Sequence, residues 1–368
     1  MSPGFVVRGP RGTRKESAIR NHSSAIVWYV AAVGLYAVFA TYLYRPHFAG
    51  FARWQWLLPV NACIAGMGAY VLSRRWVMGF SGSFLAGLLY GFGPYLLGLG
   101  KFHPTAGLLA ATIPWLFVPA AFLGKKRGKW VGVPLLLLPF VVVVLFFYLS
   151  AAWPQHRLFA APLQAEMRPA DLAGFVAPLV VVRRSTALIG LYHVPVAALV
   201  LGLAMMFKAR RHGFLVVLVA GMLLAFCKSL LGPPAVHWLG VSPILWLSIP
   251  MTSCAVLSGI GLQGLIEAGH GDRKWILAAA IVLGVLAVVT LLLAVKYFQF
   301  IFGLADGYAR LFVEAGKRYL VGAVAMAILY LMTRQNLRVH WLRWALLCVA
   351  LGLDIFLGAR HVVDNILR

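Results

Sequence analysis

The sequence contains few charged residues and very few acidic ones. Only 11% of its 368 residues are charged and nine are Asp or Glu, whereas 62% are hydrophobic. A soluble domain carries roughly twice this share of charge, so a soluble enzyme is excluded. The net charge of +24 comes from small basic clusters between long apolar runs. This layout is typical of the cytoplasmic loops of a polytopic membrane protein and argues against a nucleic-acid-binding domain.

Local metal-binding and disulfide patterns are also missing. The four cysteines, at positions 63, 227, 254 and 348, lie within apolar runs without CxxC spacing, which indicates small buried side chains. Histidines 47, 103, 193 and 237 fall at one predicted end of the helices, but no pair has the i, i+4 or HxH spacing of a local ligand set. The sequence therefore predicts no metal site, unless the fold brings distant histidines together.

Long apolar runs dominate what is present. A bilayer core of roughly 30 Å requires about 20 apolar residues in a helix. Eleven runs approach this length, so we predict an all-α, polytopic integral membrane protein with about eleven transmembrane helices in one domain, 23–368. The runs are 23–44, 56–72, 77–99, 104–123, 130–152, 192–207, 214–230, 244–265, 276–295, 319–332 and 341–357.

The basic residues predict the orientation of this domain. Residues 1–22 form a polar, basic segment without the pattern of a cleavable signal, so we predict a cytosolic tail before a retained first helix. With the N-terminus inside, most basic residues of the short connections fall on the cytosolic side, as the positive-inside rule requires. The same topology assigns most acids to the outer side: Glu166, Asp171, Asp306, Glu314 and Asp364, with Asp354 near the outer end of the last helix.

Two long outer connections have a mixed composition. Segments of about 154–191 and 296–318 alternate apolar stretches with charged residues, which is too polar to span a bilayer and too apolar to stay in water. We predict that both lie along the outer membrane interface, the second as an amphipathic helix.

Two glycine patterns admit a functional or a structural interpretation. Gly259, Gly261 and Gly264 match the GxGxxG dinucleotide fingerprint, but they lie inside an apolar run and not between a strand and a helix. Ser83, Gly87 and Gly91 form a small-residue stripe at i, i+4 and i+8. We interpret both patterns as sites of close helix packing without chemistry.

Five further segments carry a family resemblance. They are GSFLAGLLYGFGP at 82–94 with GLGKFHP at 98–104, STALIGLYHVP at 185–195, SCAVLSGIGL at 253–262 and LDIF at 353–356. In this order they resemble the YfhO-like bacterial membrane proteins of the GT-C glycosyltransferase superfamily, over roughly residues 55–358. The resemblance implies a multi-pass protein of the bacterial inner membrane with an outward-facing cavity. There, a polyprenyl-phosphate sugar would donate its glycosyl group to an extracytoplasmic glycan, lipid or protein acceptor.

The chain departs from this family in its first outer loop. Family members usually carry a long first outer loop with an acidic residue that serves as catalytic base or metal ligand. Here the corresponding segment, 44–55, is short and contains no Asp or Glu. The resemblance allows a divalent metal ion as cofactor, but the sequence identifies no ligands for one.

Glycosyl transfer with inversion needs a base for the acceptor hydroxyl and cations for the departing phosphate. The candidate bases on the outer side are Asp171, Glu166 and His47, because imidazole exchanges protons near neutral pH. Surface ion pairing with neighbouring arginines is the alternative role of the two carboxylates. The candidate phosphate-binding residues are Arg45, Arg53, Lys101, His103, Arg157, Arg168 and Lys228.

The missing acid leaves the activity open. One hypothesis is an active glycosyltransferase that uses a polyprenyl-phosphate sugar, with the membrane lipids as its surroundings and partners. The other is a non-catalytic relative that binds lipid phosphate or scaffolds a glycan-assembly complex. A transporter is a third hypothesis, disfavoured because ionisable residues are rare at the helix centres, with Asp354 as the main exception.

Overall fold

The computed structural model describes eleven stretches of the chain, and these contain helices and no strand. The stretches are residues 12–52, 55–77, 79–99, 104–127, 129–152, 195–208, 212–226, 243–267, 273–300, 306–334 and 340–367. The predicted all-α class is confirmed for them, and each of the eleven apolar runs overlaps a helix.

The helices follow one another in the order of the apolar runs. Their bounds are α1 (Gly12–Tyr44), η1, a 3-10 helix (Arg45–Gly50), α2 (Leu57–Ser73), α3 (Phe80–Gly91), α4 (Pro94–Leu99), α5 (Pro104–Arg127), α6 (Lys129–Ala152), α8 (Pro195–Lys208), α9 (His212–Ala225), α12 (Pro243–Trp246), α13 (Ser248–Glu267), α14 (Arg273–Phe300), α15 (Asp306–Arg334) and α16 (His340–Leu367).

Six of these segments are long and apolar enough to cross a membrane. They are Ile26–Gly50, Phe80–Leu99, Ser248–Glu267, Arg273–Val295, Phe312–Thr333 and Trp341–Asp364. Four shorter apolar helical segments of 10–17 residues lie in α2, α5, α6 and α9. The protein thus has the helices of a membrane protein, while the count of about eleven spans and the cytosolic N-terminus stay predictions.

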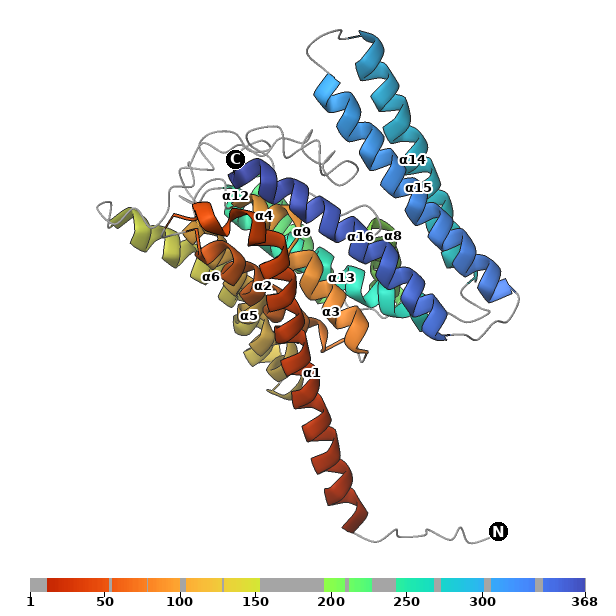
Figure 1. Ribbon diagram of the computed structural model, residues 1–368. Helices are drawn as coiled ribbons and strands as arrows, with labels where there is room; N and C mark the ends of the chain where they lie inside the picture. Colours follow the sequence, from red (N-terminus) through yellow and green to blue (C-terminus); the bar gives the residue numbers. More distant parts are fainter. Residues whose placement is uncertain are drawn as a thin grey trace, which may run out of the picture.

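The helices form a bundle with a hairpin beside it (Figure 1). α13 lies at the centre and packs against α3, α8 and α9, while α2 packs between α3 and α5, and α5 against α6. α14 and α15 run side by side as a long hairpin, and α16 lies between this hairpin and the bundle. The N-terminal half of α1 projects beyond the other helices, away from the end where α16 finishes.

Three boundaries differ from the sequence-based expectation. α1 begins at Gly12, inside the predicted tail. The run 77–99 is divided into α3 and α4 at Gly93, because Pro94 lacks the N–H that would continue the helix. The segment 296–318 belongs to the end of α14 and the first part of α15, with 301–305 outside the described residues.

Glycines permit the closest helix contacts, as predicted. A Cβ added at Gly82 would lie 2.8 Å from the carbonyl oxygen of Gly259, and one at Gly259 would lie 2.6 Å from that of Gly82. On another face of α13, a Cβ at Gly261 would overlap the carbonyl oxygen of Ala198 in α8. The GxGxxG pattern therefore lies inside a helix and serves packing. The stripe on α3 does the same, because Gly87 and Gly91 face α2.

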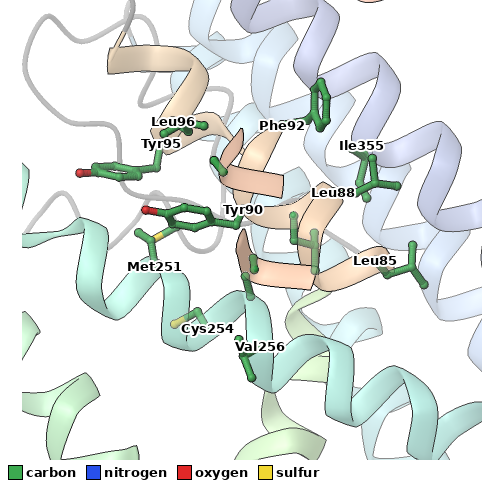
Figure 2. Packing of buried hydrophobic residues seen from close by; sticks show 14 of the residues in the cluster. Leu85, Leu88, Tyr90, Phe92, Tyr95, Leu96, Met251, Cys254, Val256 and Ile355 are labelled. Atoms are coloured by element: carbon green, nitrogen blue, oxygen red, sulfur yellow. The ribbon is translucent and has the colours of Figure 1, made fainter. Parts of the chain in front are cut away.

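The α3–α4 segment has buried side chains on both sides (Figure 2). Tyr90 points toward α13, where Met251 lies beside it, and Ile355 of α16 lies on the opposite side of α3. Tyrosine and cysteine are only weakly polar, so both can be buried between helices. A buried tyrosine also needs a hydrogen-bond acceptor for its hydroxyl.

The hydroxyl of Tyr90 bonds to a carbonyl group that a proline leaves without its usual partner in the helix. It donates a hydrogen bond of 2.6 Å to the carbonyl oxygen of Ala110 in α5. Ala110 lies four residues before Pro114, which has no N–H, so this carbonyl lacks its usual partner within the helix. The tyrosine thus replaces a hydrogen bond that the proline removes.

We expect Tyr90→Phe to lower the free energy of unfolding by about 1–3 kcal/mol, because the Ala110 carbonyl is then left unsatisfied. In a Pro114→Ala background the new amide of residue 114 can bond to Ala110, and the same change should cost less than about 1 kcal/mol. Denaturant unfolding in detergent micelles of the four proteins measures this coupling. Equal losses in both backgrounds would contradict the proline explanation.

Candidate functional site

The segment 44–55, predicted to be the first outer connection, contains the short helix η1. Pro46 lies in its first turn, where a missing N–H is tolerated. Aromatic side chains hold the segment in place. The ring of Phe48 stacks on Trp56 at 5.1 Å, and Phe51 contacts both rings edge-on, at 5.4 and 5.3 Å. Tryptophan is enriched at membrane–water interfaces, while the side of the membrane on which this segment lies stays a prediction.

His47 of η1 contacts a carboxylate from the last helix. Its Nε2 lies 2.8 Å from Oδ1 of Asp364, although 317 residues separate the two in sequence. An ionised carboxylate only accepts, so Nε2–H donates, and the Nδ1 lone pair of the neutral ring stays available for a proton. The side chains are 17% and 29% exposed, so the pair is partly buried and still accessible to solvent. This is an oriented imidazole with the features of a general base.

Asp364 has a second partner on its own helix. Nε of Arg360, one turn earlier in α16, lies 3.8 Å from Oδ2 of Asp364. Asp364 lies in the last turn of α16, where the helix dipole opposes a negative charge. The carboxylate therefore does not stabilise the helix end. Its contacts with His47 and Arg360 offset the unfavourable interaction with the helix dipole. Arg360 is exposed, so it can also contact an anion from outside.

Arg45 is a further cation on η1. It lies two residues before His47 in η1 and is exposed. We name His47, Asp364, Arg360 and Arg45 the η1–α16 site. It contains a candidate base, a carboxylate that contacts it and an arginine that pairs with this carboxylate, while Arg45 belongs to it by its place on η1. Such groups suit an acceptor hydroxyl and a phosphate.

The structure describes two of the predicted site residues, His47 and Arg45. The other candidate bases, Glu166 and Asp171, lie outside the described residues. The same holds for the remaining predicted phosphate ligands: Arg53, Lys101, His103, Arg157, Arg168 and Lys228.

Asp364 and Arg360 were not selected as site residues from the sequence. The predicted topology assigned Asp364 to the same side of the membrane as His47, and this was the available signal. Nothing in a spacing of 317 residues indicates which of the outer acids contacts His47. Only the packing of α16 against α1 and α4 makes that choice.

Metal ligands do not gather in the described part of the chain. No group of three or more His, Cys, Asp or Glu with the geometry of a metal site occurs there. Cys63, Cys254 and Cys348 are free thiols on different helices.

Comparisons with known proteins add no relative. No family model, curated protein or solved structure matches the chain. The resemblance to GT-C proteins consequently stays a prediction from the sequence motifs.

Proposed function

We propose that the protein is a membrane-embedded glycosyltransferase that uses a polyprenyl-phosphate sugar to glycosylate an extracytoplasmic acceptor. The observation that carries the proposal is the 2.8 Å contact between His47 and Asp364 at the predicted outer end of the helices. It supplies an acid–base group where the sequence of the first outer loop has no acid. The motif order shared with GT-C proteins supports the same activity.

The site residues have distinct roles in this reaction. Nδ1 of His47 takes the proton of the acceptor hydroxyl while the acceptor oxygen forms a bond to the anomeric carbon. The bond from that carbon to the phosphate oxygen breaks, and the lipid phosphate leaves with the electron pair. Asp364 accepts the Nε2–H hydrogen bond and stabilises the imidazolium that forms, as the carboxylate of a catalytic triad does.

The arginines act on the leaving group. The guanidinium of Arg360 offers a fork of donors to phosphate oxygens, and Arg45 on η1 provides a second positive charge. Both lie near the site where the phosphate develops its charge in this proposal. Glu166, Asp171 and the cations of the undescribed segments remain proposed contributors to the same reaction.

We expect His47→Gln and Asp364→Asn each to lower transfer by about 10²- to 10⁴-fold, because each removes proton transfer or its orientation. The measurement is the transfer of labelled sugar from polyprenyl-phosphate donors to membrane acceptors by the purified protein in lipid nanodiscs. Lys274→Gln, which changes an exposed cation in the first turn of α14 outside the η1–α16 site, serves as the control with unchanged transfer.

Absence of transfer by the unmodified protein with every donor would overturn the catalytic proposal. Retained activity in both site variants would instead reject His47 as the base and point to Glu166 or Asp171.

A non-catalytic role is the second candidate function. One observation favours it. Each carboxylate oxygen of Asp364 already contacts a partner, Oδ1 with His47 and Oδ2 with Arg360, as in an ion pair that serves structure alone. In that case the protein would bind lipid phosphate, or scaffold glycan assembly, without transfer. Binding of polyprenyl phosphate that is unchanged in His47→Gln but weakened in Arg360→Gln, with no transfer by either, would support this role.

A further inference from the structure

A second charged cluster lies between the hairpin and α16, away from the η1–α16 site. Arg318 of α15 is placed between two carboxylates. Its Nη1 lies 4.0 Å from Oδ1 of Asp354 in α16, and its Nη2 lies 4.0 Å from Oε2 of Glu314, one turn earlier in α15. All three residues belong to segments that are long and apolar enough to cross a membrane.

The two contacts of Arg318 have the same length but different surroundings. The side chain of Asp354 is 3% exposed, whereas that of Glu314 is 54% exposed. Water or lipid headgroups screen the Glu314 pair, so its contribution is small. The Asp354 pair is buried, so breaking it in an apolar environment costs more than breaking the exposed pair. Arg318 is therefore coupled mainly to α16 and only weakly to its own helix neighbour.

The helix that carries Asp354 also carries Asp364. Ten residues of α-helix separate the two, which is about 15 Å along the axis. α16 contacts α1, α4 and α13 of the bundle as well as α15 of the hairpin. Its rotation about its own axis decides whether Asp364 faces His47. A fixed contact at Asp354 restrains that rotation, because a helix is stiff over this length.

We propose that Arg318 and Asp354 are positioning residues for the η1–α16 site. The pair sets the rotation of α16 against the hairpin and thereby holds Asp364 at Nε2 of His47. The inference concerns the site of the proposed function and deepens it, but the contact it explains is present without any substrate. A test that uses no substrate therefore separates the two proposals.

The readout is the rate at which diethyl pyrocarbonate modifies His47 in the full-length protein in nanodiscs, measured by peptide mass spectrometry. The reagent attacks a ring nitrogen that carries a lone pair. The Asp364 contact holds the proton on Nε2, and its loss lets the proton move to Nδ1 so that Nε2 can react as well. The Asp364→Ala variant provides the fully released rate. The informative variant is the double change Arg318→Met with Asp354→Leu. It removes both buried charges together, which folded proteins tolerate far better than the loss of one.

We expect this double variant to fold, and diethyl pyrocarbonate to modify its His47 about fivefold faster. This factor corresponds to the net free energy of about one lost hydrogen bond. The matched control is Glu314→Gln, which breaks the exposed contact of the same arginine at the same distance and should leave the rate unchanged. Arg318→Lys keeps the positive charge and should retain most of the protection.

If the Arg318–Asp354 pair serves stability alone, the modification rates of His47 should follow a different pattern. The double variant would then protect His47 as well as the unmodified chain, and this result would overturn the inference. An equal acceleration in Glu314→Gln would overturn it too. If the double variant fails to fold, loss of protection in folded Asp354→Asn supports the inference, and full protection in that variant rejects it. Missing glycosyl transfer with an intact pattern of His47 protection would reject the proposed function and leave this inference standing.

Discussion

Replacing Gly261 by valine should prevent the helices α8 and α13 from packing and abolish most of the folded protein. The added Cβ would overlap the carbonyl oxygen of Ala198, which belongs to the backbone and cannot turn away as a side chain can. The contact is repeated one turn along, where a Cβ at Gly202 of α8 would overlap the carbonyl oxygen of Leu257. Because the helices are in backbone contact at two adjacent places, a small local shift cannot make room for the valine. We therefore expect the free energy of unfolding to fall by about 3 kcal/mol or more.

The recovery of monodisperse protein in detergent and its unfolding midpoint measure this effect. Gly352→Val in α16 is the matched control, because nothing lies within 4 Å of a Cβ added there. Both variants place a β-branched residue in a transmembrane helix, so they differ in packing and not in helix propensity. A folded Gly261→Val protein with an unchanged midpoint would show that α8 and α13 do not approach as described.

Gly87→Leu should release α1 from the bundle. A Cβ at Gly87 would overlap the hydroxyl of Tyr36 in α1 and the carbonyl oxygen of Gly66 in α2. Tyr36 is fully buried, stacks on Phe84 at 4.8 Å and donates a 2.8 Å hydrogen bond to the Phe84 carbonyl oxygen. Most residues of 26–44 are exposed, and Tyr36 is the largest side chain of this part of α1 that is fully buried, so its expulsion removes a main contact of α1 with the bundle.

The expected result is faster proteolysis of the released helix and faster modification of His47, because η1 follows directly on α1. Gly34→Leu, on the same helix as Tyr36, places the larger side chain where no atom lies within 4 Å and should change neither rate. Unchanged proteolysis of Gly87→Leu would mean that α1 is held by other contacts.

The helices themselves were predictable from the sequence because apolar length alone identifies them. A run of about 20 residues without charge has few alternatives to a helix in a bilayer. The same criterion fails where the chain departs from a straight helix, as at Gly93 and Pro94, because the apolar composition continues through the break. It also failed at Gly12, where polar residues extend α1 although no hydropathy signal marks them.

The candidate site was predicted only in part, for a different reason. His47 and Arg45 could be proposed from side-chain chemistry and membrane side, both of which are local properties. The partner of His47 could not be identified, because the choice among the outer acids depends on which helices become neighbours. In the same way, Asp354 could be noted as an unusual charge, but its pairing with Arg318 follows from the packing of α15 on α16.

The contact between His47 and Asp364 has a consequence for the order of events during synthesis. His47 leaves the ribosome 317 residues before its partner, a delay of roughly 15–65 s at ordinary translation rates. During that time no carboxylate from α16 can contact the imidazole of His47. The His47–Asp364 contact therefore forms only after α16 has been synthesised, and an incomplete chain lacks it.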